Sequence, residues 1–101
     1  MSQIILKKTN LLKLLADPSR YKILELLASS NGRLCVGEIA DQSNNSHSAV
    51  SHQLAKLEAS GIIKPVRKGQ QVCYILQENN AEVSALLKIM KILSTKNIYT
   101  N

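Results

Sequence analysis

The spacing of apolar residues along the chain predicts five helices. In each helical segment, apolar side chains recur every three or four residues, which places them on one face of a helix. Asp17 followed by Pro18 favours a helix start, because a carboxylate can cap the helix and proline is tolerated at its first position. Asn79 and Glu82 form a second expected capping pair. The expected helices span residues 4–15, 18–29, 36–42, 46–60 and 80–96.

After Gly61 the apolar period changes from that of a helix to that of a strand. Val72, Tyr74 and Leu76 alternate with their neighbours, and a basic turn around Lys68 precedes them. This pattern predicts a two-stranded hairpin with a basic tip. The expected order is α-α-α-α-β-β-α, with a helix-turn-helix directly before the hairpin. The fold class is therefore mainly α with a small β-hairpin, in the layout of a winged helix-turn-helix.

The outward face of the fourth helix is a candidate surface for contacting DNA. When Val50, Leu54 and Leu57 point inward, a polar face without acidic residues points outward. Serine, histidine and lysine side chains can donate hydrogen bonds to base edges or phosphates. The alternative is an ordinary solvated helix face. The outward residues are Ser48, Ser51, His52, Ala55 and Lys56.

Composition and charge strengthen the DNA interpretation. The 101 residues, 45% of them apolar, fit one domain spanning 1–101. The formal charge of +6 points to a polyanionic partner, either nucleic acid or an anionic membrane surface. Lys64, Arg67 and Lys68 cluster at the hairpin, and residues 59–77 contain no acid. Such cations can neutralise phosphates, which favours DNA as the partner.

Several other classes of protein are disfavoured. No apolar run approaches the length that spans a bilayer, and two cysteines are too few for a disulfide scaffold. We therefore expect a soluble, cytoplasmic protein with no membrane contact. The sequence shows no acid pair, no Ser-His-Asp set and no glycine-rich phosphate loop. We therefore expect that the protein is not an enzyme. The remaining alternative is a winged-helix protein-interaction module that binds neither DNA nor an inducer.

Five segments in the same order resemble the ArsR/SmtB type of winged-helix transcriptional repressor. They are LADPSRYKILELL at 15–27, VGEIA at 36–40, SHSAVSHQL at 46–54, LEASGII at 57–63 and RKGQQVCY at 67–74. The resemblance covers about residues 6–95. It implies a homodimeric repressor that leaves its operator in response to a metal ion, a metalloid or a thiol-reactive signal.

By the same resemblance, residues 46–56 are the recognition helix and residues 67–71 are the tip of the wing. We expect double-stranded operator DNA and a second copy of the chain as partners. Wide apolar faces on the first and last helices agree with a dimer, although both helices could instead complete the monomer core. A two-fold dimer predicts an inverted-repeat operator. The candidate DNA-binding residues are Ser46, His47, Ser48, Ser51, His52, Gln53, Lys56, Arg67, Lys68 and Gln70.

Two metal sites that occur in similar repressors are incomplete in this chain. One would need two cysteines flanking Val36, but the second position is Gly37. The other would need a histidine and acid set on the last helix, which carries only Glu82. We therefore expect no metal and no cofactor. His47 and His52 are interpreted as DNA-facing or structural residues.

Cys35 and Cys73 are candidate redox or metalloid sensors. The alternative is that both are small buried apolar residues, which suits Cys73 in the middle of a strand. In a winged helix, the segment before the third helix can lie beside the second strand of the wing. We therefore hypothesise that the two sulfurs approach closely enough to form a disulfide or share a soft ligand.

Overall fold

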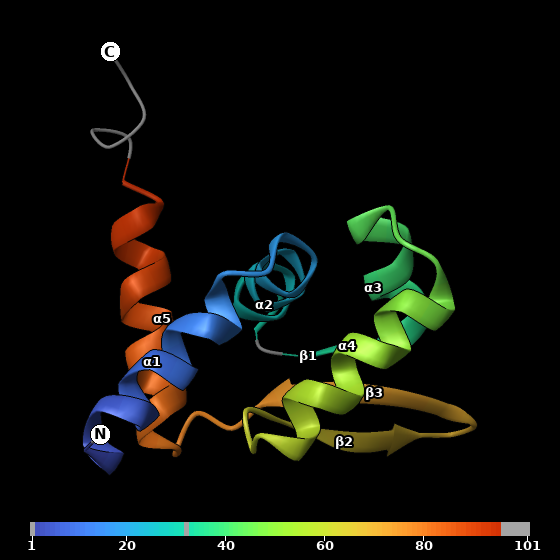
Figure 1. The fold of residues 1–101 in the computed structure, drawn as a ribbon. Coiled ribbons are helices and arrows are strands. Elements are labelled where there is room, and N and C mark those ends of the chain that lie inside the picture. The colour runs from blue at the N-terminus through green and yellow to red at the C-terminus, as the bar shows by residue number, and fades with distance from the viewer. Residues whose placement is uncertain (1, 32, 96–101) are drawn as a thin grey trace.

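The computed structural model describes residues 2–31 and 33–95 of the chain. Figure 1 shows a helical body from which a β-hairpin projects. The elements are α1 (Gln3–Leu15), α2 (Pro18–Ser29), β1 (Arg33–Cys35), α3 (Val36–Ser43), α4 (His47–Ala59), β2 (Ile63–Lys68), β3 (Gln71–Leu76) and α5 (Ala81–Leu93).

The predicted helices are confirmed, with differences at their ends. Asp17 caps α2 as expected, because its Oδ1 accepts a 3.0 Å hydrogen bond from the Arg20 backbone N–H. The cap of α5 is Asn80 rather than the expected Asn79, and its side chain accepts a bond from the Glu82 backbone N–H. The expected end of this last helix at residue 96 lies outside the described residues.

The sequence pattern did not predict β1, which precedes α3 directly. Its three residues are too few to reveal a period of two. β1 pairs antiparallel with β3, and β2 pairs with the other side of β3, giving the sheet order β1-β3-β2. Cys35 is the register partner of Cys73 in this sheet. The extra strand therefore brings the start of α3 beside the second strand of the hairpin.

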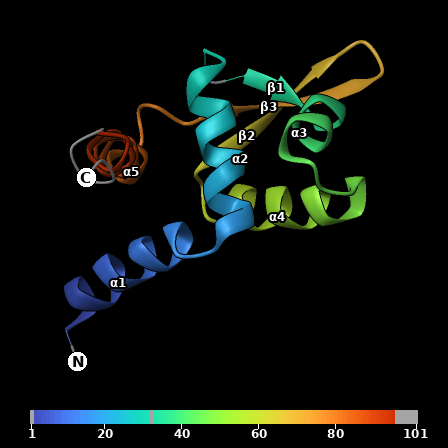
Figure 2. The same cartoon turned by 90° about the horizontal axis from the view of Figure 1, so that it is seen from above.

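The hydrophobic core joins α2, α3, α4, α5 and the sheet. Val50, Leu54 and Leu57 form the buried stripe predicted for α4. Ile23 and Leu27 from α2 are also fully buried, and Figure 2 shows α2 running between α5 and the α3–α4 pair. Packing on this core fixes which face of α4 is inward.

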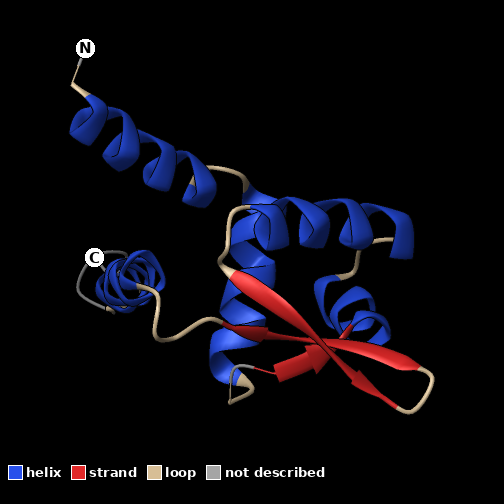
Figure 3. Cartoon of the chain, turned by 90° about the horizontal axis from the view of Figure 1, so that it is seen from below, coloured by secondary structure: helices blue, strands red, loops and turns tan. Residues whose placement is uncertain are grey.

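Helices α1 and α5 keep apolar side chains exposed. Of the residues of α1, none is buried, whereas α5 buries Val83, Leu86 and Met90. Figure 3 shows both helices on the side of the molecule away from the tip of the hairpin. No helix in the described ranges has the length and apolar character needed to cross a membrane. The large exposed apolar residues are Ile4, Ile5, Leu6, Leu12 and Ile92.

Candidate nucleic-acid interface

Helix α4 presents a polar face because its cap and its apolar stripe fix its start and its rotation. Ser46 caps the helix, and its Oγ accepts a 3.1 Å hydrogen bond from the Ala49 backbone N–H. The cap leaves the first turn of α4 at the surface, where backbone N–H groups favour an anion. Among the predicted contact residues on this helix, all but one are exposed. The exposed ones are Ser46, His47, Ser48, Ser51, His52 and Lys56.

Gln53 is the exception, because its side chain is half-buried and points towards α2. Its Oε1 accepts a hydrogen bond of 3.4 Å from Arg20 Nη1. Its Nε2 donates a bond of 3.5 Å to Asp17 Oδ2. The amide of Gln53 thus joins α4 to the first turn of α2, and its predicted contact with DNA stays a prediction.

Arg20 is a residue whose role the sequence pattern did not indicate. Its Nε donates to the Leu14 carbonyl at 2.7 Å, and its Nη2 donates to the Lys13 carbonyl at 2.8 Å. Carbonyls in the last turn of a helix lack the usual partner four residues on, so this guanidinium helps to satisfy the C-terminal end of α1, where the Lys13 carbonyl also accepts the Ala16 backbone N–H. Arg20 therefore connects α1, α2 and α4 through one side chain.

The negative charge of Asp17 is favoured in this cluster. The hydrogen bond from the Arg20 backbone N–H lowers the pKa of Asp17 most strongly, and the Arg20 charge and the Gln53 amide also lower it. Partial burial opposes these effects but does not reverse them. The carboxylate therefore stays ionised at neutral pH while it caps α2.

The hairpin formed by β2, the Gly69-Gln70 turn and β3, called the wing below, places cations beyond the helical body. Gly69 has a φ of 63°, a backbone conformation that a two-residue hairpin turn requires and that glycine adopts without strain. Arg67, Lys68 and Gln70, which are predicted to contact DNA, are all exposed. Figure 1 shows the turn at the far end of the hairpin from α5.

β2 lies at one edge of the sheet. Pro65 sits within this strand, opposite Tyr74 of β3, and it has no backbone N–H to offer to a further strand. Lys64, Arg67 and Lys68 are exposed along the same strand. A basic edge of this kind attracts the phosphates of DNA of any sequence, because contacts to phosphate do not depend on the bases.

Helix α3 packs closely against the start of α4. A Cβ added to Gly37 would lie 3.8 Å from His47 Cε1, so the imidazole lies over the glycine. Among the described residues, no group of three His, Cys, Asp or Glu side chains could hold a metal ion. Within residues 2–31 and 33–95, neither His47 nor His52 therefore belongs to a group of side chains that could bind a metal ion.

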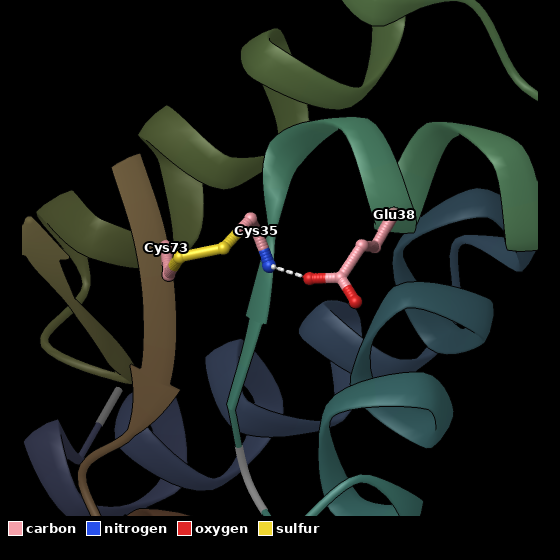
Figure 4. The surroundings of a disulfide bond; sticks show 3 residues. All are labelled: Cys35, Glu38 and Cys73. Carbon is pink, nitrogen blue, oxygen red and sulfur yellow. Dashed lines mark hydrogen bonds between the residues drawn. A yellow bond between two sulfur atoms is a disulfide. The ribbon is translucent and has the colours of Figure 1, made fainter. Parts of the chain in front are cut away.

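The two cysteines are joined as a disulfide between β1 and β3, so the hypothesised approach is confirmed. Figure 4 shows the bond linking the strand residue Cys73 to Cys35 at the start of α3. Cys73 is fully buried, whereas Cys35 is half-buried. The Cys35 backbone N–H donates a 3.0 Å hydrogen bond to Glu38 Oε1. The disulfide thus ties the wing to the first turn of α3.

Residues 17–64 match the sequence model of a family described as bacterial regulatory protein, arsR family. This segment contains α2, α3 and α4, and it ends at the first residues of the wing. The chain is also similar to the transcriptional repressor SdpR of Bacillus subtilis strain 168. The two are 40% identical over 67 residues, which are 66% of this chain and 72% of SdpR.

Solved structures of similar sequence share the fold. The antimony-specific transcriptional repressor AntR superposes with a TM-score of 0.78 and 30% identity, covering 92% of this chain and 81% of AntR. The transcriptional regulator HlyU from Vibrio vulnificus CMCP6 superposes with a TM-score of 0.77 and 34% identity. That match covers 92% of this chain and 93% of HlyU. The likeness extends over α1 and α5 as well as the central helices.

Proposed function

Because the chain belongs to the ArsR family of bacterial regulatory proteins, which are DNA-binding transcriptional regulators, we propose that it is a repressor that binds an inverted-repeat operator as a homodimer. The observation that carries the proposal is the arrangement of two surfaces. The outward face of α4 is polar and exposed, and the basic wing extends beside it. The family consists of regulators, and the proposal gives the chain no catalytic step.

Helix α4 would enter the major groove and read base edges. Its exposed side chains include hydroxyl, imidazole and ammonium groups, which can donate to the acceptors on bases or to phosphate oxygens. The small Ala55 on the same face lets the helix approach closely. The side chains proposed to contact DNA from this helix are Ser46, His47, Ser48, Ser51, His52 and Lys56.

The wing would bind the phosphate backbone next to the groove. Arg67 and Lys68 are exposed cations, and Gln70 at the turn can donate a hydrogen bond through its amide. Contacts to phosphate hold the protein on the duplex without selecting a sequence. In this arrangement α4 would select the DNA sequence, and the wing would add affinity that does not depend on sequence.

A second copy of the chain would cover the exposed apolar side chains of α1 and α5. Ile4, Leu12 and Ile92 are 65%, 55% and 62% exposed, which is high for large apolar side chains on adjacent helices. A two-fold axis on this side leaves both wings and both α4 helices free (Figure 3). Two recognition helices would then lie about 34 Å apart, one turn of DNA, and require an inverted repeat. Occupation of a promoter by this dimer would block polymerase.

Selection of bound sequences from a random duplex library, followed by titration of the selected duplex at increasing salt, tests this function. We expect an inverted repeat and an affinity that falls steeply with salt, because phosphate contacts release counterions. A module that binds only other proteins would enrich no sequence. Recovery of no preferred duplex, or an affinity independent of salt, would contradict the proposal.

A further inference from the structure

Helix α1 carries positive charge that the proposed contacts of α4 and the wing do not use. Its three lysines are all exposed, and no residue of this helix is acidic. A helix that carries cations without acids attracts a polyanion. The lysines are Lys7, Lys8 and Lys13.

Lys13 is the lysine of α1 that hydrogen bonds hold close to α4. Its backbone carbonyl accepts a bond of 2.8 Å from Arg20 Nη2, while Arg20 Nη1 donates a bond of 3.4 Å to Gln53 on α4. A single guanidinium therefore spans from the last turn of α1 to the recognition helix. Asp17, the next acid along the chain, accepts bonds from the Arg20 backbone N–H and the Gln53 amide.

The rotation of α1 directs Lys13 away from the hydrophobic core. Leu11 and Leu15 are partly buried against that core. Residues two positions apart on a helix are about 200° apart around its axis, so Lys13 lies opposite both leucines. Leu12, which the proposed dimer would cover, lies about 100° from Lys13 around the same axis. The Lys13 ammonium would therefore lie at the rim of the dimer contact, where its flexible chain can reach a phosphate.

Helix α1 lies at the opposite end of α4 from the tip of the wing. Figure 1 shows α4 between α1 and this tip, and Figure 3 shows the same order from below. The wing would therefore contact DNA at the outer end of each half-site. Since α1 carries exposed apolar residues proposed to meet a second copy, the two α1 helices of a dimer would lie near the centre of the operator, between the two α4 helices.

We propose that the last turn of α1 is a third DNA-contacting element, in which Lys13 binds a backbone phosphate between the two half-sites of the operator. This inference rests on the proposed function. The contact adds affinity and reads no base. An anionic membrane surface is the other polyanion that a basic helix with exposed apolar side chains binds. DNA is favoured because Arg20 holds Lys13 beside the polar face of α4, which offers no large apolar side chain to a membrane.

The first experiment titrates the selected duplex with Lys13→Gln at several salt concentrations. This variant removes the charge and keeps the backbone carbonyl that Arg20 binds. We expect affinity to fall about fivefold, and the dependence of log affinity on log salt to fall by about one, for each protomer bound. Lys13→Arg should keep the wild-type values. Lys22→Gln is the matched control, since it removes an exposed lysine from a hollow between α2 and α5. Equal effects of Lys13→Gln and Lys22→Gln would overturn the proposal.

The second experiment locates the phosphate on the DNA. Duplexes are made in which a neutral methylphosphonate replaces one phosphate at a time. A replacement between the half-sites should weaken binding of the wild type about fivefold and have no further effect on Lys13→Gln, because the charge that it would lose is already absent. A replacement at the outer end of a half-site should weaken both proteins equally. Equal sensitivity of the two proteins to every central replacement would overturn the assigned position.

Two further measurements separate this role from its alternatives. Sedimentation of Lys13→Gln should give the same oligomeric state as the wild type, and a shift to monomer would assign the lysine to the dimer contact instead. Flotation with phosphatidylglycerol vesicles should leave the wild type unbound, and binding that Lys13→Gln abolishes would overturn the proposal in favour of a membrane. Failure of the wild type to select any duplex would overturn the proposed function. Selection by the wild type with unchanged affinity of Lys13→Gln would overturn this inference alone.

Discussion

Arg20 on α2 and Gln53 on α4 are hydrogen-bonded at 3.4 Å although 33 positions separate them in the chain. The same guanidinium binds the carbonyls of Lys13 and Leu14 at the end of α1. One side chain therefore links the helix proposed for the dimer interface to the helix proposed for the major groove.

Replacing Arg20 by alanine should lower the free energy of unfolding by about 2 kcal/mol, because charged hydrogen bonds to two helix carbonyls and to Gln53 are lost. Gln53→Ala should cost about 1 kcal/mol. The double variant should show a coupling of roughly 0.5 to 1 kcal/mol in denaturant unfolding. Arg33→Ala is a matched control at an exposed arginine and should change stability little. Strict additivity would show that the Arg20–Gln53 bond contributes nothing in solution.

His52→Ala should reduce affinity by about 1 to 3 kcal/mol at particular base pairs of the operator, because the imidazole is proposed to contact a base edge. Binding to a set of operators with single substitutions checks this position by position. A uniform loss across all duplexes would remove His52 from base reading and leave it a backbone contact.

Arg67→Ala should weaken binding to every duplex alike and lower the dependence of log affinity on log salt by about one, since one phosphate contact is lost. Titration at several salt concentrations measures this slope. Arg33→Ala, which removes an exposed arginine from β1 outside the wing, serves as the control and should keep the wild-type slope. A change in sequence preference without a change in slope would contradict the assigned role.

Leu12→Glu and Ile92→Glu should each shift the protein from dimer to monomer, because the proposed interface would bury an unpaired carboxylate. Sedimentation equilibrium at micromolar concentration measures the change, and operator affinity should fall with it. Gln42→Glu adds the same charge at an exposed position of α3, outside the proposed interface, and should leave the dimer intact. A monomeric wild-type protein would contradict the dimer directly.

The pH dependence of the free energy of unfolding should reveal how much the ionised Asp17 side chain stabilises the start of α2. The pKa of Asp17 is lower in the folded protein than its ordinary value of 3.8. Its contribution is therefore fully present above pH 3.8 and is lost as the pH falls through the lower folded pKa. Asp17→Asn keeps a good capping side chain but removes this titration. In denaturant unfolding, the free energy of unfolding should fall more steeply with decreasing pH for the wild type than for Asp17→Asn. Parallel falls in the two proteins would contradict a contribution from the ionised Asp17 side chain.

Most of the fold could be predicted because its elements have strong local signals. The stripe of Val50, Leu54 and Leu57 determines both the existence and the rotation of α4. Strand β1 could not be predicted, because its pairing with β3 joins residues far apart in the chain. The pattern of apolar positions locates the start of α5 only to within about one residue. It therefore could not distinguish Asn80 from Asn79 as the cap.

The candidate interface could be predicted where exposure follows from helical rotation. His52 and Lys56 are outward because they lie opposite the buried stripe. Gln53 lies at the margin of that stripe, where side-chain direction depends on the neighbouring helix, and Arg20 of that helix binds it. Such a contact has no signature in either local segment. The pairing of Cys35 with Cys73 could be hypothesised from the fold, but only the register of β1 on β3 fixes it.

The position of β2 at the edge of the sheet has a consequence for solubility. An open edge strand can pair with a strand of another molecule, and charged side chains or a proline discourage this. β2 carries Pro65 together with Lys64, Arg67 and Lys68. The cations proposed to hold phosphate therefore also protect the protein from aggregation through its own sheet. Removing several of them at once would expose the edge, so loss of soluble protein must be measured separately from loss of DNA binding.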